Sequence, residues 1–420
     1  MVVRLRSYAI CFVLLATGVA SAQDKVRMVA AEGDGAKYWP RWRGPTGQGL
    51  AKDADYPDTW SDSENVLWKT KVPGKGNSSP IVWDQHLYLT TAYDNGKRRS
   101  ILAFNRATGD QLWETFVPEG IPEGAYGKNG HASGTPTTDG ERIYAYFGNR
   151  GIFCVDKAGK QVWHTTFGDS SPLHGMACSP LLYKDRVIVF QEGAKPSGFV
   201  VALDKLTGKE LWKTPRKETV SWGSPAAISV NGKDQIIVSS SFKVYAYDPD
   251  NGKNIWSCDG NTVEVIPTPV VGHDMLFCCS GRAGPTLAIR PMDAAGDITK
   301  SHVAWRVAQG SPFVPSPLLY GDHLYMVNDI RSVVSCFDAK TGKLLWKERC
   351  GVELSEGFSA SPIGVNNRSF SRMILERPLC SPTAPSSSCW ASTSSAPRRS
   401  PRRHSWMAAG TGARRRTFGA

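Results

Sequence analysis

The stretch Ser179–Trp212, SPLLYKDRVIVFQEGAKPSGFVVALDKLTGKELW, contains the unit from which most of the chain is built. It predicts four short strands, of which the first is opened by a Ser-Pro pair. Arg186–Gln191, Phe199–Leu203 and Glu210–Trp212 follow, and Asp204 begins the last turn. A four-stranded unit of this kind cannot bury both of its faces alone and must pack against further copies of itself. The fold therefore requires that the unit recur along the chain.

Copies of this unit recur along the 420-residue chain. Ser/Thr-Pro pairs open them at intervals of 44 to 56 residues, with prolines at Pro80, Pro136, Pro180, Pro225, Pro269, Pro317 and Pro362. Each copy ends on a tryptophan: Trp68, Trp113, Trp163, Trp212, Trp256, Trp305 and Trp346. Four copies place an Asp in the last turn: Asp156, Asp204, Asp248 and Asp338. This pattern predicts an all-β propeller of four-stranded antiparallel blades, with six complete units and partial ones.

The repeated residues suit a propeller blade for simple reasons. Proline has no amide hydrogen and therefore fits the first residue of a strand. The turn Asp can accept backbone amide hydrogens, and the glycine after it can adopt positive φ. We expect the small residue of the third strand, such as Ala202, to leave room for the Trp of a neighbouring blade. Because each blade is covered only by its neighbours, the ring depends on contacts between blades.

The pattern x-Ala-x-Asp-x-x-Thr-Gly-Lys-x-x-Trp, clearest at Ala202–Trp212 and Cys336–Trp346, resembles the pyrroloquinoline quinone (PQQ) repeat. This repeat builds quinoprotein alcohol dehydrogenases and BamB-like envelope proteins, and many of its carriers bind no quinone. The resemblance covers about residues 65–367 and implies eight blades in an intact relative. On this interpretation Asn65–Val72 is a strand that completes the last blade through Trp68.

Residues 1–22 have the pattern of a secretory signal, with Arg4 and Arg6 before an apolar run and Ala20-Ser21-Ala22 at its end. The apolar run is too short to span a bilayer, which favours an exported protein of the periplasm or envelope. Residues 23–64 contain Tyr38–Gly49, which resembles a segment found ahead of such propellers in a bacterial envelope subfamily. Two interpretations stay open: a strap across the propeller, or a binding surface formed by Trp39, Trp42 and Arg43.

Residues 368–420 differ in composition from the rest of the chain. They contain ten Arg and one Glu, so they supply +9 of the net charge of +12, together with many Ser and Pro. Such a segment does not build a packed core. It is interpreted as an out-of-frame or truncated end, a disordered basic tail, or a nucleic-acid arm. Because nearly all of the basic excess lies there, we expect no nucleic-acid partner for the propeller.

The cysteines are interpreted as packing residues. Cys154 and Cys336 occupy the position of the small residue, and Cys278-Cys279 lie in the apolar run MLFCC. Some PQQ alcohol dehydrogenases hold a disulfide between adjacent cysteines against the quinone. Alternate side chains of a strand point to opposite faces, which favours reduced cysteines here, although a vicinal disulfide stays an alternative.

Candidate binding residues precede the Ser/Thr-Pro pairs, where loops of successive blades should meet at one end of the ring. They are His131, His174, Trp222, Glu264 and Glu356. Loops on a rigid scaffold commonly carry function, so these residues predict a funnel for a small molecule or a peptide. Two alternatives are a structural role in the loops and a divalent metal site of His and Glu side chains.

Three hypotheses about function follow. The first is an exported, non-catalytic scaffold that binds an envelope protein or a small ligand and uses no cofactor. The second, implied by the resemblance, is a PQQ- and Ca²⁺-dependent dehydrogenase with Trp222 as a stacking surface. The third is a truncated fragment without function. The chain lacks the Gly-rich loop, His-Arg-Asp and Asp-Phe-Gly motifs of kinases, so a kinase-related label would describe ancestry only.

Overall fold

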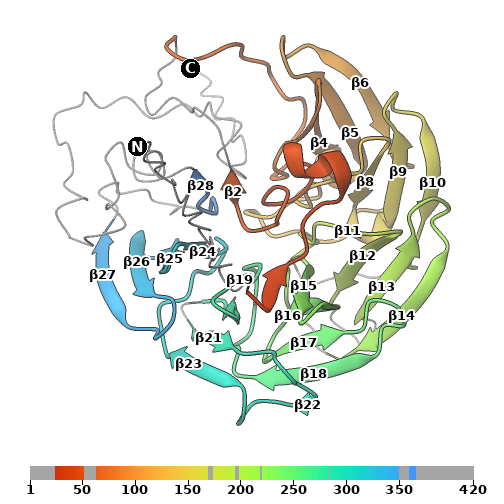
Figure 1. Ribbon diagram of the computed structural model, residues 1–420. Helices are drawn as coiled ribbons and strands as arrows, with labels where there is room; N and C mark the ends of the chain where they lie inside the picture. Colours follow the sequence, from red (N-terminus) through yellow and green to blue (C-terminus); the bar gives the residue numbers. More distant parts are fainter. Residues whose placement is uncertain are drawn as a thin grey trace, which may run out of the picture.

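The computed structural model describes residues 24–51, 63–168, 174–193, 198–217, 220–282, 284–349 and 359–365. In the described residues, five four-stranded antiparallel sheets and one six-stranded sheet, whose four middle strands are antiparallel in the same order, follow one another around a central axis (Figure 1). In each sheet the first strand lies nearest the axis and the fourth lies at the rim. The described part of the chain is therefore a ring of propeller blades, as the repeat predicts.

The blades use consecutive strands, with one exception in the fifth. The first three comprise β3 (Ile81–Trp83), β4 (His86–Tyr93), β5 (Arg98–Asn105), β6 (Gln111–Phe116); β7 (Thr137–Thr138), β8 (Arg142–Tyr146), β9 (Ile152–Asp156), β10 (Gln161–Thr165); and β11 (Leu181–Tyr183), β12 (Arg186–Gln191), β13 (Gly198–Asp204), β14 (Glu210–Arg216). The others comprise β15 (Ala226–Val230), β16 (Lys233–Ser239), β17 (Lys243–Tyr247), β18 (Asn254–Asp259); β19 (Val270–Gly272), β20 (Met275–Cys279), β21 (Thr286–Ile289), β23 (Val303–Val307); and β24 (Leu318–Tyr320), β25 (His323–Asn328), β26 (Val333–Asp338), β27 (Leu344–Arg349).

Short elements lie outside the four-stranded pattern. Three 3₁₀ turns are η1 (Gly33–Lys37), η2 (Asp94–Gly96) and η3 (Gly148–Arg150). Four further strands are β1 (Val26–Met28), β2 (Leu50–Ala51), β22 (Gly296–Asp297) and β28 (Gly364–Val365). β22 pairs in parallel with β18, and β2 pairs in parallel with β28.

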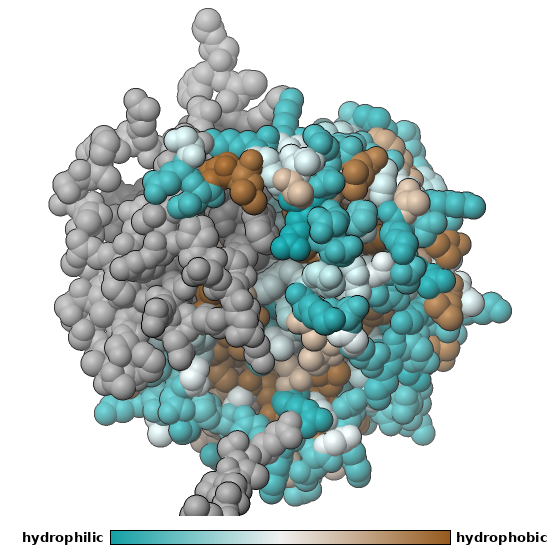
Figure 2. All heavy atoms as spheres, turned by 45° about the horizontal axis from the view of Figure 1, so that its top comes forward, coloured by the Kyte–Doolittle hydropathy of each residue, from teal (hydrophilic) through white to brown (hydrophobic). Residues whose placement is uncertain are grey.

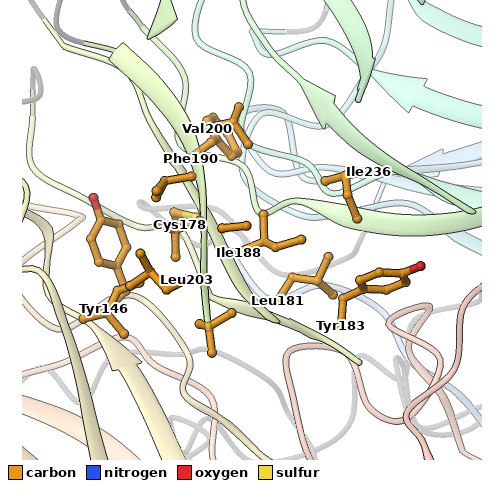
Figure 3. Packing of buried hydrophobic residues seen from close by; sticks show 14 of the residues in the cluster. Tyr146, Cys178, Leu181, Tyr183, Ile188, Phe190, Val200, Leu203 and Ile236 are labelled. Atoms are coloured by element: carbon orange, nitrogen blue, oxygen red, sulfur yellow. The ribbon is translucent and has the colours of Figure 1, made fainter. Parts of the chain in front are cut away.

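The largest apolar cluster fills the space between the second, third and fourth blades. Figure 3 shows Tyr146 of β8, Ile188 and Phe190 of β12, and Ile236 of β16 converging from three blades. Cys178 lies in the same cluster and is a free thiol. Each blade therefore contributes both of its faces to the cores on either side, which is how a propeller removes apolar area from water.

The first, second, third and fifth blades each dock on the next blade through their terminal tryptophan. In the third blade, the Trp212 indole Nε1 donates a hydrogen bond to the Pro249 carbonyl of the fourth blade at 2.9 Å. The ring packs against Gly252, whose φ of 71° fits the turn. The same contacts join Trp68 to Gly109, Trp113 to Gly159, Trp163 to Gly208, and Trp305 to Gly342. Trp68 thus docks on the first blade as predicted, although residues 65–72 form no strand among the described residues.

The small residue of the third strand lies opposite the Trp of its own blade. Ala202 is paired across β13 and β14 with Trp212, and Cys336 is paired in the same way with Trp346. Trp163 of the preceding blade belongs to the same apolar cluster as Ala202, and a contact of the small residue with a neighbouring blade's Trp stays a prediction. The small side chain leaves room for the indole to lie over the sheet of the same blade, and the edge of the indole then contacts the next blade.

The fourth blade departs from this docking. Trp256 donates its indole hydrogen to the Gln235 side chain of its own blade at 2.9 Å and is fully buried. The turn of the fifth copy has lost the regular Asp and Gly spacing, so the usual acceptor is not at its usual place. β22 instead pairs with β18 beside Trp256.

The Ser/Thr of each Ser/Thr-Pro pair links neighbouring blades around the axis. The Thr135 amide donates to Ser179 Oγ at 3.0 Å, and the Ser179 amide donates to Ser224 Oγ at 2.9 Å. Equivalent bonds join Ser79 to Thr135, Thr268 to Ser316, and Ser316 to Ser361. The hydroxyl of one blade therefore accepts the hydrogen of a buried backbone amide from the preceding blade, where the first strand leaves this amide unpaired.

Residues 24–51 form a strap across the centre of the ring (Figure 1). β1 pairs with β15, Trp39 bridges Val82 of β3, and the Pro40 carbonyl accepts the Thr138 amide hydrogen at 2.9 Å. Trp42 Nε1 donates to Thr268 Oγ1 at 3.1 Å, and Arg43 donates to the Pro317 carbonyl at 2.8 Å. The strap thus contacts five of the six described blades, and Trp39, Trp42 and Arg43 each make one of these contacts.

The cysteines pack as expected. Cys278 and Cys279 are free, and they lie in different apolar clusters on the two faces of the fifth blade. Cys154 and Cys336 are also free and buried. The predicted signal segment, the basic tail and Glu356 lie outside the described residues. None of the helices in the described ranges is long and apolar enough to cross a membrane.

Candidate functional site

Loops from every blade meet at one end of the ring, because all blades run in the same direction. These are the loops that lead from a fourth strand to the next first strand, and the turns between second and third strands. The predicted residues His131, His174, Trp222 and Glu264 all lie in such loops. We call this end the mouth; the strap pairs with the first strands inside the ring.

His174 and Trp222 are brought together. Their rings are stacked with centroids 5.9 Å apart, and Tyr126 lies against His174 with centroids 5.5 Å apart. The Trp222 Nε1 donates to the Gly175 carbonyl at 2.9 Å, and Trp222 is only 9% exposed. The His174 carbonyl accepts the Tyr126 amide hydrogen at 3.1 Å. The three rings therefore form one aromatic cluster that ties the loop before β7 to the third and fourth blades.

Glu264 is paired with Arg282 of the fifth blade. This hydrogen bond raises the pKa of Arg282, and the guanidinium also lies over the Phe313 ring at 5.5 Å. The Tyr126 hydroxyl is near enough to contribute to the same rise in the Arg282 pKa. Glu264 and Arg282 thus link the loop before β19 to the turn between β20 and β21 at the mouth.

Asp329 lies in the turn between the second and third strands of the sixth blade. The charge of Lys128, in the loop of residues 117–134, acts on Asp329, whose pKa is raised chiefly because burial disfavours the carboxylate. Asp329 Oδ1 accepts the Phe313 amide hydrogen at 2.9 Å and the Val314 amide hydrogen at 3.3 Å. One loop from the first pair of blades thus lies near residues of the third, fifth and sixth.

A buried ion pair anchors this loop. Arg99 of β5 and Glu123 of the loop are both fully buried, with Nη2 and Oε2 2.5 Å apart and Nη1 and Oε1 3.1 Å apart. Arg99 Nη1 also donates to the Phe147 carbonyl at 2.6 Å. His131 bonds the Glu123 carbonyl at 2.8 Å and packs against Gly96, so it supports the loop from the side of the first blade. His131 is thus placed with the anchor and not with the aromatic cluster.

A second buried carboxylate lies below Trp222. Glu192 pairs with Arg216 at 3.0 Å and accepts hydrogen bonds from Ser221 and Ser240. All of these side chains are buried, and they come from the third and fourth blades. Buried polar groups of this kind are stable only when fully bonded, so the network fixes the backbone on which Trp222 stands.

The mouth exposes apolar side chains beside these polar groups. Tyr126, Phe242 and Ile330 are 58%, 57% and 59% exposed, and Val263 is also exposed. The Phe242 amide donates to the Thr262 carbonyl at 3.1 Å, which places Phe242 beside Val263. We define the mouth surface as Tyr126, Phe242, Val263, Arg282 and Ile330. Figure 2 shows a face that is hydrophilic over most of its rim and carries separate hydrophobic patches.

Several residues at the mouth have unusual backbone geometry. His174, Phe242, Glu264 and Arg282 have φ of 66°, 69°, 61° and 49°. Residues other than glycine rarely adopt this left-handed backbone region, and each such residue lowers the stability of the fold by on the order of 1–3 kcal/mol. The blades beneath hold these residues in place.

Sequence reasoning placed the mouth correctly but missed much of its content. Tyr126, Arg282 and the Arg99–Glu123 pair were not among the candidates, although residues 117–134 and 282–301 are longer than the equivalent segments of other blades. The length of these two segments was the feature of the sequence that could have indicated additional residues at the mouth. Glu356 lies outside the described residues, so its place at the mouth stays a prediction.

The described residues do not fit a quinone stacked on Trp222. One face of that indole is covered by His174, its nitrogen is bonded to Gly175, and the ring is buried. Cys278 and Cys279 are buried within a strand and are free. Among the described residues, no three His, Cys, Asp or Glu side chains are grouped to hold a metal ion.

Blades of this kind, with Trp edges that dock on the next blade's Asp-Gly turn, define a PQQ-like propeller. The family described as outer membrane protein assembly factor BamB matches residues 59–122 and 97–348, and the chain belongs to this family. BamB of Burkholderia pseudomallei is 23% identical over 290 residues, which are 67% of this chain and 68% of that protein. A polyvinylalcohol dehydrogenase of Pseudomonas sp is 23% identical over 53% of this chain and 40% of that protein.

Among solved structures, BamB of Moraxella catarrhalis aligns with a TM-score of 0.45 and 16% identity. The alignment covers 68% of this chain and 80% of that one. The relatives thus include both an assembly factor and an enzyme.

Proposed function

We propose that this chain is an exported, non-catalytic binding module of the cell envelope, and that its mouth surface binds a segment of an envelope protein. The observation that carries the proposal is the mouth surface itself, where exposed apolar side chains and the exposed Arg282 lie in loops at the same end of the ring. Exposed apolar groups that are rimmed by charges are typical of protein interaction sites. The family described as outer membrane protein assembly factor BamB supports the same class of partner.

The support beneath the mouth surface also fits binding. The loop that carries Tyr126 is anchored by the Arg99–Glu123 pair, and Phe242 is held at positive φ. A surface that is already ordered loses little conformational entropy when a partner binds. Tyr126 combines a large apolar ring with a hydroxyl, a combination common among the residues that contribute most to interfaces.

Export is part of the proposal and is supported by the signal-like pattern of residues 1–22. A fusion to alkaline phosphatase, which is active only after export, would test it. Activity that depends on residues 1–22 is expected, and activity without them would contradict export by this segment.

The binding proposal is tested by comparing two triple variants of the full chain in pull-downs from envelope fractions with quantitative mass spectrometry. The first, Tyr126→Ser, Phe242→Ser and Val263→Ser, changes the mouth surface. The second, Leu206→Ser, Leu211→Ser and Leu344→Ser, removes exposed apolar side chains from other parts of the blades. Loss of the same envelope proteins from the first variant alone is expected. Equal losses from both would contradict the proposal.

The second candidate is a quinoprotein dehydrogenase, which the polyvinylalcohol dehydrogenase relative favours. The described residues around Trp222 do not fit the quinone, so this candidate depends on that relative. Titration of the purified chain with PQQ and Ca²⁺ separates the two functions. A saturable change in quinone absorbance, abolished by Trp222→Ala, would replace the binding proposal with the enzyme.

A further inference from the structure

Two arginines of the strap are buried inside the ring. Arg41 is 7% and Arg43 is 1% exposed. Arg41 Nη2 donates to the carbonyls of Val29 and Pro45 at 2.7 and 2.8 Å, and Arg43 Nη2 donates to that of Pro317. In the described part of the chain, neither guanidinium forms an ion pair. Burial lowers the pKa of Arg41 to about 10 and that of Arg43 to about 9.

This arrangement leaves positive charge in a medium of low dielectric constant. A buried charge is costly unless an opposite charge or several hydrogen bonds compensate for it. The carbonyl groups compensate in part, because their dipoles point at the guanidinium hydrogens. A counter-ion beside Arg41 would complete the compensation.

A cavity of about 30 Å³ lies beside Arg41, between the strap and the third, fourth and fifth blades. Its polar lining includes Arg41, Thr46, Ser179, Ser224 and Thr268, and no acidic residue lines it. A single water needs roughly 10–15 Å³ by the same measure, so the cavity has room for one ion somewhat larger than water.

The hydroxyl groups that line the cavity are arranged as donors. Ser179 Oγ accepts the Thr135 amide hydrogen, Ser224 Oγ accepts the Ser179 amide hydrogen, and Thr268 Oγ1 accepts the Trp42 indole hydrogen. Each oxygen is therefore already engaged as an acceptor. The hydroxyl hydrogens stay available, and none of the three hydroxyls donates to another described residue. Hydroxyl donors and a guanidinium cation both bind anions, so this lining favours an anion as the occupant of the cavity.

We propose that this cavity binds one monatomic halide, chloride under ordinary conditions, between the Arg41 guanidinium and the hydroxyls of Ser179, Ser224 and Thr268. The ion joins the strap to three blades. Because it binds the folded ring and has no such site in the unfolded chain, it stabilises the folded state as its concentration rises.

The test uses the full chain in two measurements. Crystals soaked in sodium bromide should show an anomalous peak in the cavity beside Arg41. The melting temperature should rise to a plateau as sodium bromide replaces sodium gluconate at constant ionic strength. No anomalous peak, with equal melting temperatures in the two salts, would overturn the proposal and leave water as the occupant.

Variants assign the effect to the cavity. Arg41→Gln should abolish the bromide-dependent rise in melting temperature, and Thr46→Val should raise the half-saturating bromide concentration several-fold. Lys37→Gln is the matched control, because Lys37 is an exposed cation of the same strap that pairs with Asp34. Equal bromide dependence in wild type, Thr46→Val and Arg41→Gln would contradict the site even if Arg41→Gln were less stable.

Discussion

Trp212 and Gly252 meet across the boundary between the third and fourth blades. A Cβ atom built on Gly252 would lie 2.4 Å from Trp212 Cε3, and the indole nitrogen is held by the Pro249 carbonyl at 2.9 Å. The contact recurs along the ring with other Trp and Gly residues. It therefore explains why glycine stands at this turn: both its positive φ and its lack of a side chain are used.

Gly252→Ala should destabilise the chain by about 2–4 kcal/mol, because it combines backbone strain with overpacking against Trp212. Gly232→Ala is the matched control. Its φ is 78°, close to the 71° of Gly252, but no heavy atom lies within 4 Å of its Cβ position. Urea unfolding should show a clearly smaller loss for Gly232→Ala. Equal losses would mean that backbone strain alone explains why glycine is required at position 252.

Ser224→Ala should cost about 1–3 kcal/mol, because it leaves the buried Ser179 amide without its acceptor. Ser257→Ala, at a half-buried position of β18, should change the free energy of unfolding by less than about 0.5 kcal/mol. Thermal and urea unfolding of both variants check the comparison. If the two losses were the same, the hydroxyl link between blades would have no energetic role.

Glu123→Gln should cost about 3–5 kcal/mol, since it leaves the Arg99 charge buried without its partner. It should also increase hydrogen exchange in residues 117–134. Glu119→Gln, an exposed change in the same loop, should leave both quantities near their wild-type values. Unchanged exchange in Glu123→Gln would show that the ion pair does not anchor the loop.

The repeated turns predict how stability depends on pH. The Thr207 hydroxyl and the backbone amides of the turn donate to Asp204 and hold its pKa below the usual 3.8. Because the folded pKa is the lower one, the stabilisation is present above about pH 3.8 and is lost as pH falls through the folded pKa.

Asp204→Ala should therefore lose stability relative to wild type at neutral pH, and the difference should shrink in acid. Urea unfolding of both proteins at about pH 6 and about pH 3 measures the change. A difference that is the same at both values would contradict a charged Asp204 in the turn.

The sequence predicted the ring because the repeat combines several independent signals at one period. It placed His174, Trp222 and Glu264 at one end, since strand direction fixes where their loops open. It could not predict that Tyr126 would lie against His174, because the path of a long loop depends on contacts such as Arg99–Glu123. It also did not indicate that Ala202 lies opposite Trp212 of its own blade, since register across a bulge is not visible in the pattern.

The strap shows a similar limit. Its aromatic residues and glycines indicated a segment packed on the propeller, and the described residues of the strap bond to five blades. Its path was decided by contacts distant in sequence, such as Trp42 with Thr268 and Arg43 with Pro317. The buried guanidinium groups could not be foreseen, because arginine is usually a surface residue.

The central claim is that the mouth surface binds a partner. It is tested most directly by placing a photo-crosslinking amino acid at Tyr126 in one variant and at Leu206, on a turn at the opposite end of the ring, in another. After irradiation in cells, the account predicts a discrete heavier adduct from position 126, and its loss when Phe242→Ser and Arg282→Glu are added. Position 206 should give no such adduct. The same adducts from both positions, or none from position 126, would contradict the account.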